Sequence, residues 1–368
     1  MSARARCRRG PSHLARWIGA AIVLSCVLTP AMAASLARGE RGSRISDAES
    51  ASEYWDIVAR FEPNYSLFAR FLITNEGPGE HTAVATWHLV DPSGKLTSFR
   101  NGRRQGRWTL SPDGDRIRIG SSIFDQGGVA HHLEYDSKKR GISVQFEYAG
   151  SKPTAWIDAP ISGNYSIDLL DLGTPVTGSI WLEGMSETVA VSGTIVVTHT
   201  WMQQSEADIA LRRIEFASVG EGPAIYLSDL TTPAGKRHRW LVVVRDGAPI
   251  YRSTDFQLEL AGEQPSDLGY PAPSVMRVKT PELEATIDNG PPLVESDPLE
   301  DIPQPFRFLL SFKMRPHRVW RHASFELTLK DDPSRPPTAL RGSGVTTVTF
   351  LNPLPSSVSR VDASNGGV

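Results

Sequence analysis

Short apolar runs separated by glycine and proline turns make up most of this chain. Asp91-Pro-Ser-Gly94 and Ser111-Pro-Asp-Gly114 each stand between two such runs. Residues 240–244 are joined by a turn at Asp246-Gly247 to a second run in which apolar and polar residues alternate. Turn signals at these short intervals indicate antiparallel β-structure, folded as sandwiches or barrels.

One run, from Val191 to Trp201, ends in residues that could carry chemistry. Its β-branched residues 194–198 are typical of a buried strand. Because side chains alternate along a strand, His199 and Trp201 share one face and Thr198 takes the other. An imidazole and an indole therefore point together into whatever that face encloses. The alternative is a core histidine bonded to backbone beside a core tryptophan.

The order of the runs predicts two β-domains, residues 51–165 and residues 166–354. Helical patterning is confined to residues 46–60 and 206–214, and the second segment could equally form a strand. Residues 262–301 are rich in proline and acidic residues and are expected to form long loops over the second domain. Residues 355–368 are expected to be a disordered tail.

The first 33 residues have the pattern of a secretory signal peptide. Five arginines and no acidic residue precede a short apolar stretch, which ends at Ala31-Met-Ala33. We therefore expect cleavage after Ala33, a flexible leader at residues 34–50, and a periplasmic or extracellular location. Both cysteines, Cys7 and Cys26, lie in the signal segment. Contact with a membrane surface is expected only if Cys26 is lipidated.

Charge and missing motifs exclude several function classes. Loss of the signal segment changes the formal net charge from −2 to −7, because five arginines leave with it. Nucleic acid is therefore not expected as a partner. The chain has no Gly-x-Ser-x-Gly, no phosphate-binding glycine loop and no His-Glu-x-x-His. On a strand, His132 and Glu134 face away from His131, so no metal or other cofactor is expected.

Three short motifs resemble those of a known family. In the lipocalin-like dual-barrel proteins, which include carotenoid 1,2-hydratase, kievitone hydratase and AttH-type proteins, the second barrel begins with Val-x-Gly and later Asp-His-x-Trp. Val191-Ser-Gly193 and His199-Thr-Trp201 match this pattern. Glu53-Tyr54-Trp55 resembles the opening of the first barrel, and Gly342-Ser-Gly344 loosely matches the closing strand. The resemblance implies two lipocalin-like antiparallel β-barrels in tandem.

The resemblance also implies which residues form the site. In the hydratases these are the His and Trp of that strand and a downstream Tyr-x-Asp, matched here by His199, Trp201 and Tyr226. Two positions depart from the pattern: Thr198 replaces an acid, and Asp229 stands one residue too far from Tyr226. Thr198 points away from His199, so its change is expected to affect strand support. The displacement of Asp229 should matter more, because one residue reverses the face unless a β-bulge restores it.

Three hypotheses follow for the function. The first is an exported carrier that binds a hydrophobic small molecule, a lipid or isoprenoid, in a barrel or between barrels. The second is a hydratase or isomerase acting on an isoprenoid-like double bond, with His199 and Tyr226 as proton donors. The third is a carbohydrate-binding β-sandwich with exposed tryptophans. The candidate catalytic residues are His199, Tyr226 and Glu53, and the candidate ligand-binding residues are Trp201, Trp55, Tyr54 and Asp229.

Overall fold

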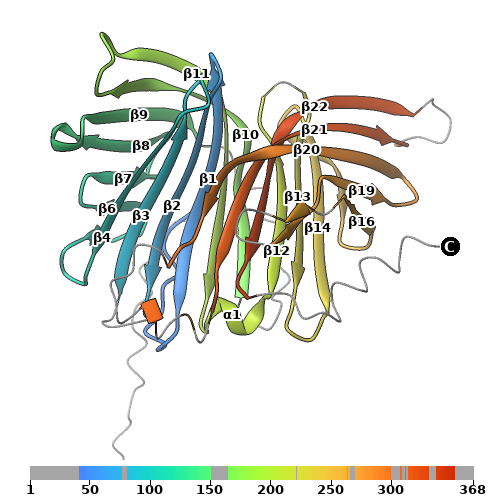
Figure 1. Ribbon diagram of the computed structural model, residues 1–368, viewed down its shortest axis with the longest axis horizontal. Helices are drawn as coiled ribbons and strands as arrows, with labels where there is room; N and C mark the ends of the chain where they lie inside the picture. The colour runs from blue at the N-terminus through green and yellow to red at the C-terminus, as the bar shows by residue number, and fades with distance from the viewer. Residues whose placement is uncertain are drawn as a thin grey trace, which may run out of the picture. The chain divides into compact units, whose positions relative to one another are not determined.

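The computed structural model describes residues 41–76, 81–150, 165–220, 222–262, 264–265, 270–299, 307–308, 311, 314–330 and 337–352 (Figure 1). The expected signal peptide, Cys26, the start of the leader and the tail lie outside these residues. Over the described residues the backbone forms two large curled antiparallel sheets and one small sheet, which confirms the all-β fold class. None of the helices in these ranges is long or apolar enough to cross a bilayer.

The first sheet has 11 strands in the order β4-β3-β2-β1-β11-β10-β9-β8-β7-β6-β5. Its centre is the antiparallel pair of β1 (Ser52–Glu62) and β11 (Val189–Met202). The remaining strands are β2 (Tyr65–Thr74), β3 (Thr82–Val90), β4 (Leu96–Arg103), β5 (Thr109–Leu110), β6 (Arg116–Ile119), β7 (Ser122–Asp125), β8 (Ala130–Ser137), β9 (Ile142–Ala149) and β10 (Tyr165–Leu182). A short 3-10 turn, η1 (Lys138–Arg140), joins β8 to β9.

The second sheet has nine strands in the order β15-β14-β13-β12-β22-β21-β20-β19-β16. A one-turn helix, α1 (Glu206–Ile209), leads into it from the first sheet. Its strands are β12 (Arg212–Ser218), β13 (Ala224–Thr231), β14 (Arg237–Arg245), β15 (Ala248–Ser253), β16 (Gln257–Ala261), β19 (Val275–Lys279), β20 (Leu283–Ser296), β21 (His317–Leu329) and β22 (Thr338–Phe350). The small sheet is β17 (Gln264–Pro265) with β18 (Pro271–Ala272).

Both sheets place their first long strand beside their last. β1 lies between β2 and β11, and β12 lies between β13 and β22. This pairing corrects the expected boundary at residue 165, because β10 and β11, which were expected to belong to the second barrel, are hydrogen-bonded in the first sheet. The register places Trp55 opposite His199 and Glu53 opposite Trp201, so these four side chains lie on one face of the strand pair.

Two segments differ from their sequence expectations. Residues 262–301, expected as loops, contain β19 and the long strand β20. Buried Leu283 and Ile287 show the period of two that places one face of β20 on the core. The prolines of β20 lie at its register shifts around Pro292, where a missing N–H does least damage to the ladder. Residues 52–60, within the expected helix, belong to β1.

Strands β1 and β11 separate two apolar cores. Trp55 and Val197 pack into the core enclosed by the first sheet. Tyr54 and Val196, on the other face, join a core to which β13 and β21 of the second sheet also contribute. A third core fills the interior of the second sheet. Each polar residue of β1 and β11 therefore belongs to one of two different environments, according to its position in the alternation.

Candidate functional site

On the first-sheet face, His199 and Glu53 form a fully buried polar pair. His199 Nε2 lies 2.6 Å from Glu53 Oε1, and neither side chain is exposed to solvent. The Trp55 ring stacks on the imidazole with centroids 4.3 Å apart and planes 8° apart, and Trp201 lies at 5.0 Å. The structure thus brings these four side chains together on one face of the strand pair, with His199 and Glu53 fully buried.

Glu53 accepts two further hydrogen bonds. The Ser43 hydroxyl donates to Oε2 at 2.7 Å, and the Arg44 amide donates to Oε1 at 2.6 Å. Three donors therefore surround this carboxylate, which places the shared proton of the pair on Nε2 of His199. The arrangement makes Glu53 an acceptor that orients the imidazole, and it does not support the expected role of Glu53 as a proton donor.

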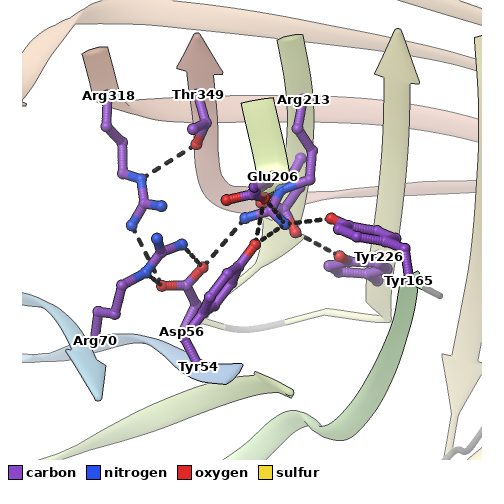
Figure 2. Close-up of polar contacts among 10 residues, drawn as sticks. Tyr54, Asp56, Arg70, Tyr165, Glu206, Arg213, Tyr226, Arg318 and Thr349 are labelled. Carbon is purple, nitrogen blue, oxygen red and sulfur yellow. Dashed lines mark hydrogen bonds and ion pairs between the residues drawn. The ribbon is translucent and has the colours of Figure 1, made fainter. Parts of the chain in front are cut away.

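On the opposite face, Asp56 is the centre of an arginine cluster between the two sheets. Arg70 donates two hydrogen bonds to its carboxylate, at 2.6 and 2.5 Å. Arg318 lies at 3.3 Å and Arg213 at 3.4 Å, both from the second sheet (Figure 2). Burial alone would raise the pKa of Asp56, but the guanidinium groups of Arg70 and Arg318 hold that pKa well below its usual range.

The pKa values of the two arginines from the second sheet are shifted in opposite directions. Burial and the charge of Arg70 lower the pKa of Arg318 to about 10. Burial also opposes the charge of Arg213, but Glu215, which lies 2.9 Å from its Nε, keeps the pKa of Arg213 above its ordinary value. Three carboxylates, those of Asp56, Glu206 and Glu215, thus balance three arginines between the sheets.

Two tyrosines accept hydrogen bonds from Arg213, and one of them connects the cluster to the short helix. Arg213 Nη1 donates to the hydroxyl oxygens of Tyr54, at 2.5 Å, and Tyr165, at 2.9 Å (Figure 2). Tyr54 in turn donates to Glu206 Oε1 on α1 at 2.5 Å. Burial raises the pKa of both hydroxyls, so each keeps its proton at neutral pH. Together these polar groups, which we call the inter-sheet cluster, are Tyr54, Asp56, Arg70, Tyr165, Glu206, Arg213, Glu215, Tyr226 and Arg318.

The cluster borders a partly enclosed space of about 30 Å³, the inter-sheet cavity. Tyr226 donates its hydroxyl proton to Glu215 Oε1 at 2.7 Å at the wall of this cavity. Burial and the carboxylate of Glu215 raise the pKa of Tyr226 well above its ordinary value. A water molecule needs a cavity of roughly 10–15 Å³, so this cavity has room for water. The other lining residues are Asp56, Ile57, Val58, Phe68, Ala69, Val196, Thr198, Ala217, Trp320, Val345 and Thr347.

The structure divides the predicted site residues between two places. Tyr54 and Tyr226 lie in the inter-sheet cluster, whereas His199 and Glu53 lie in the core of the first sheet, on the other face of β1 and β11. His199 and Tyr226 therefore lie on different sides of the β1–β11 pair, and the expectation that both donate protons to one double bond stays a prediction. The alternation of side chains along β1 and β11 separates Tyr54 from His199 and Glu53. The sequence does not show which sheet packs against each face, so it could not reveal the two places.

Asp229 does not join Tyr226. The pairing of β13 with both neighbours has no register shift, so no bulge compensates for the one-residue displacement. Asp229 is fully buried on the face opposite Tyr226, where it accepts hydrogen bonds from Arg237 at 2.8 Å and Arg239 at 3.1 Å. The structure thus gives Asp229 a structural ion pair inside the second sheet instead of a place at the cavity.

Thr198, in contrast, lies closer to the candidate site than expected. It lines the inter-sheet cavity and stands directly across from Asp56 in the register of β1 and β11. The departure from the family motif at this position therefore falls in the cavity wall and is not confined to strand support. Asp56 supplies a carboxylate to the same wall from the neighbouring strand.

Comparison with known proteins agrees with this architecture. No protein-family model and no curated protein sequence matches the chain. Among solved structures, an AttH protein from Nitrosomonas europaea matches with a TM-score of 0.59 and 15% identity, over 82% of this chain and 93% of that protein. The protein has the two-sheet fold of AttH. CghA in complex with Sch210972 matches with a TM-score of 0.57 and 11% identity, over 83% and 89% of the two chains. Kievitone hydratase from Nectria haematococca matches with a TM-score of 0.54 and 12% identity, over 86% and 96%.

Proposed function

We propose that the protein is a hydratase-type enzyme that adds water across a double bond of a mainly apolar small molecule between the two sheets. The inter-sheet cavity has room for the attacking water, and the substrate enters when side chains of its wall move apart. The observation that carries the proposal is the 2.7 Å hydrogen bond between Tyr226 and Glu215 at this wall. Protonation of an alkene needs a proton donor and a base in a space from which bulk water is excluded, because bulk water would capture the proton and the cation.

The pair can complete the proton balance of a hydration. The Tyr226 hydroxyl gives its proton to one alkene carbon, and a water molecule in the cavity attacks the other. The attacking water loses a proton to Glu215, which returns it to the phenolate along the existing hydrogen bond. Arg213, held 2.9 Å from Glu215, offsets the negative charge that the pair carries during this cycle.

Aromatic side chains at the same wall suit the cationic intermediate. Trp320 and Phe68 both line the cavity, with ring centroids 5.4 Å apart. The face of an indole or phenyl ring stabilises a nearby positive charge. Trp320 is also the largest side chain of the wall, so its rotation is the simplest way to admit a substrate. Trp55, in contrast, lies in the core of the first sheet, and Trp201 lies beside His199 on that face of the β1–β11 pair.

The structural neighbours support this class of reaction without identifying the substrate. One of them is named a hydratase, and another holds a bound small molecule. At 11–15% identity they carry the fold alone, so the proposal depends on the Tyr226–Glu215 pair of this chain.

Turnover of a panel of prenylated and terpenoid alkenes in oxygen-labelled water tests the proposal. We expect one panel member to gain a labelled hydroxyl group with the parent protein. Tyr226→Phe removes the proton donor but keeps the ring, and it should lower this turnover by about 10²-fold or more. Tyr251→Phe is the matched control, because Tyr251 lies at the second sheet away from the cavity and bonds Thr280. Equal turnover by Tyr226→Phe and the parent would remove Tyr226 from the mechanism.

The carrier hypothesis makes a different prediction for the same samples. A carrier would release an unchanged apolar passenger on extraction, and no labelled product would form. A preformed carrier pocket has roughly 300–1,000 Å³. The described residues do form an open hollow of about 820 Å³, but Glu62, His132, Glu134 and Glu147 line it, and it does not suit an apolar passenger. The carbohydrate hypothesis has less support, because each tryptophan in the described ranges is buried or half-buried.

A further inference from the structure

A short segment before β1, residues 41–45, crosses the interior of the first sheet; we call it the strap. Arg41 donates to Asp171 from Nη1 at 2.6 Å and from Nη2 at 3.1 Å. Ser43 and the Arg44 amide bind Glu53, as described above. Arg41 is only 8% exposed and Ser43 only 1%. This part of the expected flexible leader is therefore built into the first sheet.

The strap supplies donors to two carboxylates that are otherwise surrounded by core. Asp171 on β10 and Glu53 on β1 are both fully buried. A buried carboxylate is stable only when donors or cations surround it. The strap provides a guanidinium, a hydroxyl and an amide, which are groups that a small polar ligand also carries.

Unpaired polar atoms lie beside the strap. Within the described part of the chain, His199 Nδ1 and Trp55 Nε1 are buried and have no hydrogen-bond partner. Nδ1 of His199 donates or accepts according to the tautomer and charge of the ring, whereas the indole nitrogen is a donor. Buried polar groups usually have a hydrogen-bond partner. Where two of them have none, a ligand or water molecule is the expected partner. A hydroxyl group could serve either atom.

We propose that this interior end of the first sheet is a second binding site, for a ligand that carries a guanidinium or ammonium group together with a hydroxyl, and that the strap is its displaceable intramolecular occupant. Asp171 takes the cation, and Glu53 with His199 takes the hydroxyl. The site is distinct from the proposed hydratase site, because His199 and Tyr226 lie on opposite faces of β1 and β11. Loss of binding here leaves the hydratase proposal intact.

Binding of a peptide in trans tests the site directly. The probe is a synthetic hexapeptide with the sequence of residues 41–46, titrated calorimetrically into the full mature chain. The parent should bind it about tenfold or more weakly than Arg41→Ala/Ser43→Ala, in which the internal competitor has lost its anchors. Adding Asp171→Asn to the double variant should abolish binding. Arg104→Ala, which removes an exposed arginine directly after β4, should behave as the parent. Failure of the folded double variant to bind the peptide overturns the proposal.

A matched pair of glycines tests displacement without removing any charge. Gly114 and Gly94 end similar turns at positive φ, +81° and +85°. A Cβ on Gly114 would lie 2.7 Å from Ser43 N, whereas a Cβ on Gly94 would meet nothing within 4 Å. Gly114→Ala should therefore expose the tryptophans near the strap to acrylamide quenching, and Gly94→Ala should not.

Hydrogen exchange of the parent covers the case in which a variant fails to fold. The amide of Arg44, bonded to Glu53, should exchange at least tenfold faster than the amides at the centre of β1. If that amide exchanges only with global unfolding, the strap is a fixed part of the fold and the proposal fails.

Discussion

Strands β1 and β11 carry two polar sites on opposite faces, and the two sites are built in different ways. On the first-sheet face, Glu53 and His199 meet across neighbouring strands, with Trp55 stacked beside them. On the other face, Asp56 is bound by arginines from three other strands, β2, β12 and β21. The first site is completed within one sheet, whereas the second exists only when both sheets are packed together.

The difference suggests that the Glu53–His199 pair positions side chains, whereas the inter-sheet cluster is the proposed reaction site. In the first-sheet pair, the strap donates two hydrogen bonds to Glu53, and an aromatic ring stacks on His199. The inter-sheet cluster combines balanced charges with a space large enough for water. Because its members come from both sheets, any change that loosens the sheets also disassembles the proposed acid–base pair. Changes in the inter-sheet cluster should therefore lower stability and activity together. Changes at the Glu53–His199 pair should lower stability with little effect on activity.

The largest expected effect is that of Asp56→Asn. The substitution keeps the shape of the side chain but leaves Arg70, Arg318 and Arg213 without the carboxylate that they share. Uncompensated buried charge should lower the free energy of unfolding by about 3–5 kcal/mol, measured by urea denaturation. Asp288→Asn, on an exposed position of β20, is the control. A loss below about 1 kcal/mol would show that the cluster does not hold the sheets together.

The same variant has a defined dependence on pH. The pKa of Asp56 in the folded protein lies below its ordinary value of 3.8. The contribution of Asp56 is therefore fully present above that value and is lost as the pH falls from 3.8 toward the folded pKa. The stability difference between parent and Asp56→Asn should shrink in this acidic range. A constant difference down to pH 2 would contradict the proposed charge balance.

The second prediction contrasts one glutamate from each face. Glu215→Gln removes the proposed base and should lower turnover by about 10²-fold. It also takes a carboxylate from buried Arg213, so the free energy of unfolding should fall as well. Glu53→Gln weakens a charge-assisted bond to His199 and should lower the free energy of unfolding by about 2 kcal/mol, while turnover by the folded protein changes far less. Urea denaturation and turnover measured on the same preparations check both results. The reverse pattern would place the reaction in the first sheet.

The sequence predicted the grouping of aromatic and polar residues on the first-sheet face, but it did not predict the inter-sheet cluster, and the reason is physical. The pair of His199 with Trp55 needs only the alternation of two strands, which short motifs reveal. The hairpin at Asp246-Gly247 was predictable in the same way, because both residues adopt positive φ, 51° and 74°. Local patterns of this kind also predicted the all-β class and the strands around it.

The inter-sheet cluster depends on docking, which no local pattern encodes. Asp56 and Arg318 are separated by more than two hundred positions and meet only because the two sheets pack against each other. A signal was nevertheless present in the second sheet. Arg213 and Glu215 flank Ile214 inside a fully buried strand, and charges in such a strand need partners from elsewhere. The strap was missed because its polar composition resembles that of a flexible leader.

The third prediction is a double-mutant cycle across the cavity wall. Thr198→Asp restores the acid of the family motif but places it directly opposite Asp56. The buried like-charge pair should lower the free energy of unfolding by about 2 kcal/mol. In Thr198→Asp/Asp56→Asn only one of these two facing positions carries a carboxylate, so the double variant should be more stable than additivity predicts, by about 1 kcal/mol or more. If the losses in free energy of unfolding were additive, the side chains at positions 198 and 56 would not interact across the cavity wall.

The smallest expected effect returns to the first sheet and concerns His131 on β8. Burial and the charge of Arg41 lower the pKa of this residue below 6.5, although Asp171 and Asp125 oppose the shift and His132 adds to it. The unfolded chain therefore takes up a proton at a higher pH than the folded protein. Above pH 6.5 both states are neutral and His131 contributes nothing to the pH dependence; as the pH falls through 6.5, stability is lost.

Adjacent histidines on β8 make this prediction easy to isolate. His131 is buried in the first sheet, whereas His132 is exposed on the other face. Between pH 7 and pH 5 the parent should lose about 1 kcal/mol or less beyond the loss of His131→Gln, and His132→Gln should follow the parent. Arg41→Ala should reduce this difference, because it removes the strap's cation from the vicinity of the imidazole. An unchanged pH dependence in Arg41→Ala would mean that the strap's guanidinium does not act on the imidazole, and the first-sheet face would then respond to pH through burial alone.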